Sequence, residues 1–384
     1  ASRSVSVAQS LIGDSRVQYL AELNADYHRV RTQHANKKQV PLWPLAQARA
    51  NKWRPEPVEG LAGASTGSAR TELAWAGFKP TKPKFIGKRV FRNFDLAELA
   101  KYIDWGPFFQ TWDLAGPYPA ILTDEVVGEQ ATKVFADGQA MLKKIIEGRW
   151  LSANGVIGLY PANAVNDDDI ALYTDDSRST VALTWHGLRQ QTEKQEVDGA
   201  MRPSRCLADF VAPKGEADDY VGLFAVTAGL GVEKKEQQFL DAHDDYSAIL
   251  FKSLADRLAE AFAECLHQRV RTDLWGYAPD EALSNEELIQ EKYQGIRPAP
   301  GYPACPDHSV KRAMFELLQA GNIGMTLTES LAMAPAASVS GFYLAHPQST
   351  YFNVGKIGED QLSDLADRSG VAVAELKRWL GPNL

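Results

Sequence analysis

Cysteine is scarce in this chain of 384 residues, and no apolar run approaches the length of a membrane span. The three cysteines, Cys206, Cys265 and Cys305, are odd in number and lie far apart. This usage argues against a disulfide framework and fits a reducing compartment. No signal peptide opens the chain, so we expect a cytoplasmic protein with no membrane partner.

Excess positive charge is also missing, because the formal net charge is -8. An acidic chain is a poor partner for nucleic acid, and its acidic surface is better suited to a basic partner. The hydrophobic content of 45% is enough for one large core or two moderate ones. Because the chain begins with Ala1 rather than Met, we expect a fragment or a processed chain.

Helical and strand periodicities mix in no regular βαβ order, which favours an α+β fold around an antiparallel sheet. The patterns predict strands at 84–91, 155–160, 179–185, 219–228 and 338–345. They predict helices at 95–103, 128–147, 245–271, 284–292, 309–320 and 359–380, the last with a break near Gly370.

The first 84 residues differ in composition from the rest. Residues 1–35 carry apolar positions at helical spacing, with a break expected at Gly13-Asp14. Residues 54–74 are rich in Gly, Ala, Ser and Pro and hold few large apolar groups, which predicts a mobile loop.

The most informative stretch is RPAPGYPACPDH, residues 297–308. Its prolines exclude helix and central strand and leave carbonyls free to accept hydrogen bonds. Arg297 offers a planar fork for a carboxylate, Gly301 allows close backbone approach, and the ring of Tyr302 can face an adenine or a cation. From composition alone, the segment is first a proline-rich turn with a surface arginine.

Longer motifs add a family resemblance. The sequences that carry it are IGKRVF (86–91), YIDWGPFF (102–109), HDDY (243–246), LADRLAEAFAE (254–264), WGYAP (275–279), SNEELI (284–289), YQGIRPAPGYPACPDH (293–308), LTES (327–330) and HPQSTYF (346–352). Over residues 85–384 the chain closely resembles the activation domain of cobalamin-dependent methionine synthase. The resemblance implies a C-shaped single domain around a twisted antiparallel sheet with flanking helices, preceded by a helical N-terminal segment.

The same resemblance suggests three parts. Residues 1–35 resemble the end of a cobalamin-binding module, 36–84 form a linker with a flexible insertion, and 85–384 form the activation domain. The axial Asp-x-His-x-x-Gly loop is not supplied, because Asp26-Tyr-His28 is followed by Arg31 where glycine is needed. Cobalamin is therefore expected on a partner module rather than on this chain alone.

The resemblance implies S-adenosylmethionine as the ligand, bound by seven residues that match the family positions. These are Asp104, Glu260, Arg297, Ala299, Gly301, Tyr302 and Tyr351. Taken by themselves, Asp104 and Glu260 would more often be solvated surface charges, since helix context gives neither a partner. Removing Arg297 is expected to leave folding almost intact while weakening ligand binding.

The implied function is reactivation of cobalamin-dependent methionine synthase by reductive methylation. The bound S-adenosylmethionine supplies a methyl group to reduced cobalamin on the partner module, so this chain acts as a methyltransferase only within the intact or reassembled enzyme. The family's electron donor is flavodoxin or a related flavoprotein, and Lys84, Lys88, Arg89 and Arg92 are docking candidates by charge only. The alternative is a non-catalytic domain that senses S-adenosylmethionine or docks cobalamin proteins.

Other motifs indicate no function. Gly63-x-Ser65-x-Gly67 matches a hydrolase elbow but lacks the preceding strand, and a hydrolase built on Ser65 is a distant third reading. Gly229-Leu-Gly231 lacks the third glycine of a Rossmann loop and is expected to be a turn. Residues 359–380 resemble a helix-turn-helix but carry too few cations for DNA, which favours structural packing.

Three polar clusters also resemble metal sites without completing one. Glu264-x-x-His267 is half of a di-iron pair and is expected on a solvated helix face. Cys305 and His308 have no second pair, and residues 166–169 lack the glycine and glutamate of a calcium loop, which favours a solvated turn. No metal and no catalytic residue is expected.

Overall fold

The computed structural model describes residues 11–12, 16–35, 41–53, 78–197 and 200–384. The chain forms two compact units, Ala1–Leu42 and Trp43–Leu384. The first contains helix α2, Arg16–Ala35, so the expected N-terminal helix is confirmed over that range. The break predicted at Gly13-Asp14, the loop at 54–74 and the Ser65 motif lie outside the described residues.

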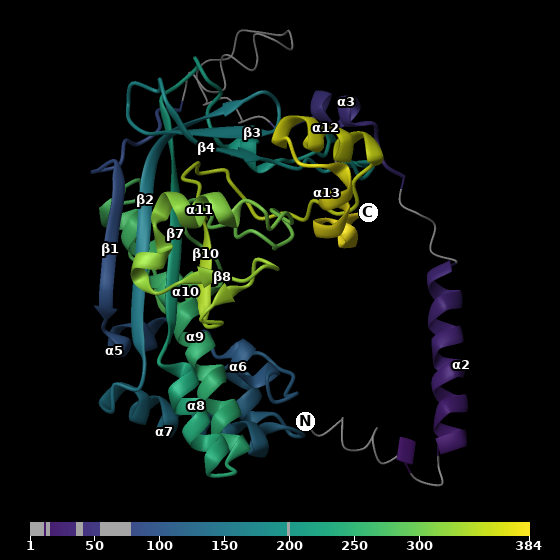
Figure 1. Cartoon of the computed structure of the whole chain (residues 1–384), viewed down its shortest axis with the longest axis vertical. Coiled ribbons are helices and arrows are strands. Elements are labelled where there is room, and N and C mark those ends of the chain that lie inside the picture. Colours follow the sequence, from purple (N-terminus) through teal and green to yellow (C-terminus); the bar gives the residue numbers. More distant parts are fainter. Residues whose placement is uncertain (1–10, 13–15, 36–40, 54–77, 198–199) are drawn as a thin grey trace. The chain divides into compact units, whose positions relative to one another are not determined.

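A six-stranded antiparallel sheet forms the centre of the second unit (Figure 1). Its strands are β1 Gly87–Phe94, β2 Ser152–Val165, β3 Asp169–Tyr173, β4 Val181–His186, β7 Asp219–Leu230 and β10 Ser338–Tyr343. The order is β10-β7-β2-β3-β4, and β1 pairs with the first half of β2 while β3 pairs with its second half. The predicted α+β class with an antiparallel sheet is therefore confirmed.

Both faces of the sheet are covered, which explains why β2 and β7 are buried almost throughout. Successive side chains of a strand point to opposite faces. In β7, Phe224 and Val226 pack into one hydrophobic cluster, and Leu223 and Ala225 pack into another. The sheet thus separates two cores, and strict apolar-polar alternation is absent from its central strands.

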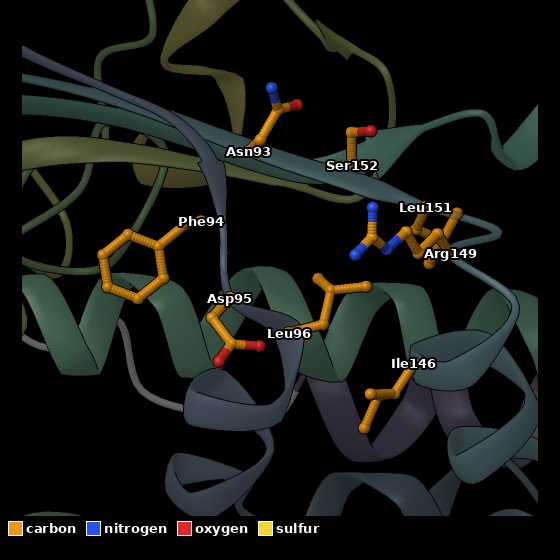
Figure 2. A pocket seen from close by; sticks show the side chains of 8 residues that line it. All are labelled: Asn93, Phe94, Asp95, Leu96, Ile146, Arg149, Leu151 and Ser152. Carbon is orange, nitrogen blue, oxygen red and sulfur yellow. The ribbon is translucent and has the colours of Figure 1, made fainter.

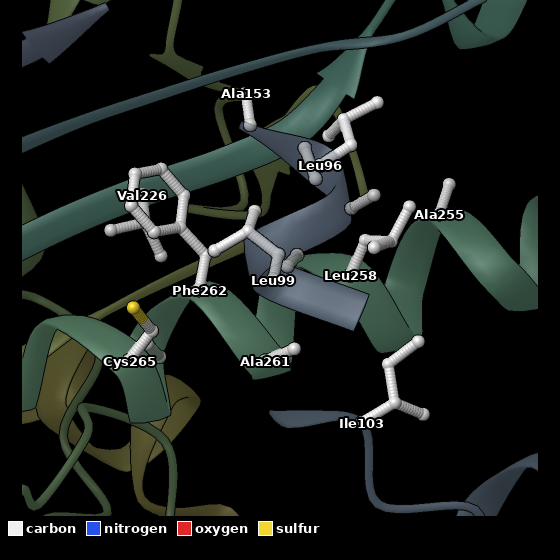
Figure 3. Packing of buried hydrophobic residues seen from close by; sticks show 14 of the residues in the cluster. Leu96, Leu99, Ile103, Ala153, Val226, Ala255, Leu258, Ala261, Phe262 and Cys265 are labelled. Carbon is white, nitrogen blue, oxygen red and sulfur yellow. The ribbon is translucent and has the colours of Figure 1, made fainter. Parts of the chain in front are cut away.

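The longest described helix, α9 (Asp245–Arg269), lies across one face and is extended by a π turn, Val270–Leu274. Figure 3 shows its apolar side, including Leu258 and Phe262, packed between Val226 of the sheet and Leu99 of the short helix α5 (Leu96–Leu99). Gly155 of β2 leaves room for this packing, since an added Cβ would lie 3.0 Å from the ring of Phe262, which is closer than an ordinary contact. This packing holds α9 against the sheet and α5.

Most of the predicted helices are present with small shifts at their ends. They are α5 with a 3-10 turn at Ala100–Tyr102, α7 Gly128–Glu147, α9, α10 Asn285–Ile289, α11 Lys311–Leu318, α12 Glu359–Ser369 and α13 Val373–Trp379. The break at Gly370 is confirmed by its φ of +70° between α12 and α13. These two helices pack through Leu362, Leu365 and Leu376, as expected for structural packing.

Several short elements were not predicted. They are α3 Leu45–Ala50, α6 Gly106–Gln110, α8 Val232–Asp241, β3, the short pairs β5 Glu196–Val197 with β6 Ala200–Met201 and β8 Thr326–Leu327 with β9 Met333–Ala334, and 3-10 turns at Ala120–Thr123, Leu207–Phe210, Ala320–Ile323 and Gly381–Asn383. The predicted turn at Gly229–Gly231 is real at Gly231, whose φ of +102° precedes α8.

The turn expected at residues 166–169 is present, and Asn166 and Asp167 are exposed, but Asp168 and Asp169 are buried rather than solvated. Asp168 is fully buried, and its carboxylate accepts from Arg189 Nε and from Arg49 Nε, each at 2.7 Å. Arg189 is also fully buried and donates to both oxygens of Asp209 at 2.8 Å. Arg49 lies on α3 and pairs with Asp364 of α12 at 2.7 Å, so these ion pairs join the two elements (Figure 1). Since buried charges need partners, the aspartates are structural.

Among the residues that the structure describes, no helix is both long and apolar enough to span a bilayer. The cysteines at 206, 265 and 305 are all free and buried.

Candidate functional site

The RPAPGY run extends the sheet beyond β10. Ile296 and Leu344 exchange hydrogen bonds of 2.9 and 3.0 Å, and Phe342 N donates to the carbonyl of Pro298 at 2.9 Å. Pro298 lacks an N–H but needs none here, since only its carbonyl faces β10. The expected use of proline carbonyls as acceptors is confirmed, and it places Arg297 beside the end of the central sheet.

A tight turn follows at Ala299–Cys305. Tyr302 N donates to the Ala299 carbonyl at 3.1 Å, and Gly301 N donates to the Cys305 carbonyl at 2.7 Å. Gly301 has a φ of +95°, and a Cβ there would meet the ring of His308 at 2.1 Å. Only glycine meets both conditions without strain. His308 is thus a support of this turn, and Cys305 is buried in the core.

A pocket of about 480 Å³ opens beside this turn. Its lining residues come from α9, the turn after α10, the RPAPGY run and the two residues after it, β7, β10 and the segment after β10: Phe224, Glu260, Glu291, Arg297, Pro298, Ala299, Tyr302, Pro303, Ala304, Val339, Tyr351 and Phe352. Five of the seven sequence-predicted site residues are therefore brought together: Glu260, Arg297, Ala299, Tyr302 and Tyr351. Mostly apolar walls with a few charged groups are typical of small-molecule sites.

The other two predicted residues lie outside this pocket. Gly301 lines a neighbouring hollow of about 330 Å³ that shares Tyr302 and Pro303 with it. Asp104 lies in the turn between the 3-10 turn at 100–102 and α6, where its carboxylate accepts from Gly106 N at 2.9 Å. Asp104 is among the lining residues of neither cavity.

Arg297 is held from behind by α9. Its Nη2 lies 2.7 Å from Glu264 Oε2, and its Nη1 donates to Tyr293 Oη at 3.1 Å. Burial opposes the charge of Arg297 and is the largest single influence, but Glu264, Tyr293 and Tyr351 together outweigh it and raise the guanidinium pKa further above its ordinary value. The backbone N–H of Arg297 donates to Tyr351 Oη at 2.9 Å, which fixes the run against the segment after β10.

The solvated helix face predicted for Glu264 and His267 is wrong. Both residues are buried, and the His267 side chain has no exposed surface. The error has a physical cause: the cation that pairs with Glu264 at 2.7 Å is Arg297, which comes from a segment distant in the sequence, while Arg271 lies 3.9 Å away on the π turn that extends α9. The spacing 264, 267 and 271 places all three side chains on one helix side, and Arg271 was the available signal of a buried ion pair.

Two carboxyl groups line the pocket near Arg297. Glu260 is half-buried on α9, and burial raises its pKa. Glu291, which the sequence did not indicate, follows α10 with a φ of +56°, and burial likewise raises its pKa. A bound cation would stabilise their charged forms. The pocket can therefore hold a ligand that carries both an anionic group and a cationic group.

Aromatic side chains supply the remaining walls. Tyr302 keeps 59% of its surface exposed and presents it at the pocket's rim, while Phe224 is fully buried beneath. Tyr351 and Phe352 are partly buried beside them. Such rings suit the flat face of a purine or the edge of a cation. Phe352 directly follows Tyr351 in the HPQSTYF motif, which was the available signal for it.

A second hollow of about 630 Å³ lies between the end of β1, the end of α7 and the start of β2. Figure 2 shows the side chains around it, including Asn93, Asp95 and Arg149. These three residues are exposed, and Phe94 is the one aromatic in its lining. It offers far less apolar surface to a ligand than the pocket around Arg297 does, so we assign the site to the latter.

Comparisons with known proteins show the family of this chain. Residues 95–370 match the family described as "Vitamin B12 dependent methionine synthase, activation domain". The structure is similar to the crystal structure of the MetH reactivation domain bound to AdoHcy, with 49% sequence identity and a TM-score of 0.80. That similarity covers 90% of this chain and 99% of the other chain. Since the family match spans well over half of its residues, this chain belongs to the family of vitamin B12-dependent methionine synthase activation domains.

Proposed function

We propose that the pocket around Arg297 binds S-adenosylmethionine and that this chain supplies its methyl group to reduced cobalamin held on a partner module. The observation that carries the proposal is the meeting of Arg297, Glu260 and Tyr302 at one pocket of about 480 Å³. The similar solved domain carries AdoHcy, which is the molecule that remains when S-adenosylmethionine gives up its methyl group.

Each part of this ligand has a matching group in the pocket. The methionine carboxylate fits the guanidinium of Arg297, and the ammonium and sulfonium fit the carboxylates of Glu260 and Glu291. The adenine fits the ring of Tyr302, and Ala299 and Tyr351 complete the walls. Asp104 and Gly301 stay in the proposed site on the family resemblance alone.

The proposed reaction needs no general acid or general base. A methyl group passes from the sulfonium to reduced cobalamin without a proton transfer, so the chain's own residues need to bind, orient and exclude water. A pocket with apolar and aromatic walls does this, and we assign no catalytic residue. The activity belongs to the intact or reassembled methionine synthase, in which this chain is the methyl-donating part.

The partners in this proposal are the cobalamin-binding module and a reduced flavoprotein such as flavodoxin. Acidic flavoproteins would meet exposed basic side chains on β1, among which are Lys88 and Arg89. Of the other candidates, Lys84 pairs with Asp273 at 2.8 Å and Arg92 donates to the Asn322 carbonyl at 2.7 Å. The buried, free cysteines are consistent with a cytoplasmic location.

Titration calorimetry with S-adenosylmethionine tests the binding step directly. A second assay adds a separate cobalamin-binding module and a reduced flavoprotein, and follows methylcobalamin by its absorption spectrum. Methylcobalamin formation supports reactivation, whereas binding without methyl transfer would support a sensor or docking domain. Absence of binding to the wild-type chain would refute the proposal.

A further inference from the structure

Behind the pocket lies a cluster of buried charged and polar side chains that does not line it. Glu264 of α9 has 8% of its side chain exposed, and His267 has none. Both contact the guanidinium of Arg297: Glu264 Oε2 lies 2.7 Å from Nη2, and His267 Nδ1 lies 3.3 Å from Nη1. Neither residue is among those that line the pocket, whereas Arg297 is.

The guanidinium of Arg297 has more N–H donors than the residues behind the pocket occupy. A guanidinium has five N–H groups, of which Nη1 and Nη2 carry two each and Nε one. Behind the pocket, Tyr293 Oη and His267 Nδ1 face the two N–H groups of Nη1, and the Glu264 carboxylate forms an ion pair with Nη2 at 2.7 Å. Within the described part of the chain, Nε has no partner and Nη2 has none besides Glu264. Two N–H groups are what a bidentate carboxylate accepts.

A guanidinium has no acceptor, so the contact between Arg297 Nη1 and His267 Nδ1 is a hydrogen bond only if Nδ1 carries no hydrogen. Burial lowers the pKa of His267 well below its ordinary value, and Arg271 and Arg297 lower it further, so the ring is neutral. With Nδ1 accepting from Arg297, the hydrogen is on Nε2, which lies 3.4 Å from Tyr277 Oη. The ring also stacks on Tyr343, with centroids 5.2 Å apart. Its orientation is therefore fixed from two sides.

A second arginine lies near the other oxygen of Glu264 without a hydrogen bond to it. Arg271 Nη1 lies 3.9 Å from Glu264 Oε1, and Arg271 itself is clamped by Glu281, with Nε–Oε2 and Nη2–Oε1 distances of 2.8 Å. Glu264 Oε1 and Arg271 Nη1 have no hydrogen-bond partner in the described residues. Glu264 therefore makes its one short contact with Arg297, and its charge lies between two guanidinium groups.

We propose that Glu264 and His267 are positioning residues, which hold Arg297 from behind so that its two remaining N–H groups receive the carboxylate of the ligand. The proposal rests on the proposed function and adds to it the source of selectivity for an amino-acid carboxylate. It differs from a purely structural ion pair in one respect: its effect depends on whether the ligand has a carboxylate.

Calorimetric titration with two ligands separates these roles: S-adenosylmethionine and its decarboxylated form, which keeps the adenine, sulfonium and ammonium. Glu264→Leu should weaken S-adenosylmethionine binding by about tenfold or more and leave binding of the decarboxylated ligand nearly unchanged. Glu264→Gln, which keeps an acceptor oxygen, should recover part of the loss. It also serves where Glu264→Leu does not fold.

Glu281→Gln is the matched control. Glu281 is as buried as Glu264, with 7% of its side chain exposed, and it contacts Arg271 rather than Arg297. Glu281→Gln should leave the affinity for S-adenosylmethionine and for its decarboxylated form unchanged. Thermal melts of the ligand-free proteins should nevertheless show that Glu281→Gln and Glu264→Gln lose similar amounts of stability. Equal losses for both ligands in the Glu264 variants, or no loss for either, would overturn the positioning role. A wild-type chain that binds neither ligand would instead refute the proposed function on which it rests.

Discussion

Arg297 Nη2 lies 2.7 Å from Glu264 Oε2, and the two side chains differ in exposure, at 21% and 8%. Arg297 thus forms the wall of the pocket and also neutralises a buried carboxylate. The expectation from sequence, that its removal would leave folding almost intact, does not follow from this geometry. Breaking one side of a buried pair costs about 3–5 kcal/mol because it leaves the other charge uncompensated.

Arg297→Ala should therefore lower both ligand affinity and stability. We expect S-adenosylmethionine binding to weaken by about 2–4 kcal/mol, since a charge-assisted bidentate contact is lost. Arg297→Lys should restore only part, because a point charge cannot reproduce the fork. Calorimetry well below each variant's melting temperature separates binding from unfolding. Arg149→Ala is the control, because Arg149 lines the hollow of about 630 Å³ at the ends of β1 and α7. A comparable loss of affinity in Arg149→Ala would indicate that the ligand binds in that hollow.

Gly301→Ala should weaken binding by distorting the turn that carries Tyr302. The added Cβ would lie 2.1 Å from the His308 ring, and the residue would also need a φ of +95°. Gly215 has the same φ of +95° with nothing within 4 Å of an added Cβ. Gly215→Ala therefore measures the backbone strain alone, about 1 kcal/mol. Equal effects of the two substitutions on melting temperature and affinity would show that His308 does not support the turn.

The pH dependence of stability should contain a contribution from His267. Its folded pKa lies well below 6.5, so only the unfolded chain takes up a proton as the pH falls through the ordinary histidine range. The free energy of unfolding should decrease from about pH 6.5 downward. The groups that face the ring, Arg271, Arg297, Tyr277, Tyr293 and Tyr343, supply no negative charge to reverse this sign.

Urea unfolding at several pH values checks this expectation. Because other groups also titrate, the relevant quantity is the difference in slope between the wild type and His267→Gln, which cannot take up the proton. If His267→Gln keeps the wild-type slope below pH 6.5, the ring is not held neutral in the folded chain.

Arg189→Lys should be strongly destabilising although it keeps the charge. Arg189 donates to Asp168, Asp209 and the carbonyls of Asp167 and Ser204 from a fully buried position, with distances of 2.7 to 2.8 Å. Lysine has three N–H donors and no planar fork, so buried acceptors would lose partners, at a cost of about 3 kcal/mol. Lys52→Gln, which removes the exposed Lys52–Asp167 pair, should cost at most about 1 kcal/mol. Denaturant unfolding gives the free energy of unfolding of both variants. Similar decreases in the two variants would contradict the importance of the buried hydrogen bonds that Arg189 donates.

Sequence reasoning succeeded where local signals agree with the fold. The α7 pattern is amphipathic and both of its ends were predicted correctly, and Gly370 marked the break between α12 and α13. Short elements such as β3 were missed because five buried residues next to a turn show no period of their own. Their strand state is decided by pairing with β2 and β4, which is a long-range interaction.

Some residues of the candidate site could likewise be predicted from local sequence signals, and others could not. The RPAPGY run was visible because proline, glycine and arginine have local conformational or chemical meaning. Glu264 and His267 were placed on a solvated face, because their partners, Arg297 and Tyr293, are distant in the sequence. Charges on one helix cannot indicate burial unless the opposite charge is known to arrive from elsewhere.

The pairing of the RPAPGY run with β10 has a consequence for the time course of folding. β10 pairs with β7 through contacts such as Val339 with Val226, which are separated by more than a hundred positions of chain. Closing loops of that size is slow, and local helices such as α9 form long before it is complete. Because Phe342 must be in place before it can donate to the Pro298 carbonyl, refolding followed by far-ultraviolet circular dichroism should recover helix early. Ligand-binding capacity should return only in the slowest phase.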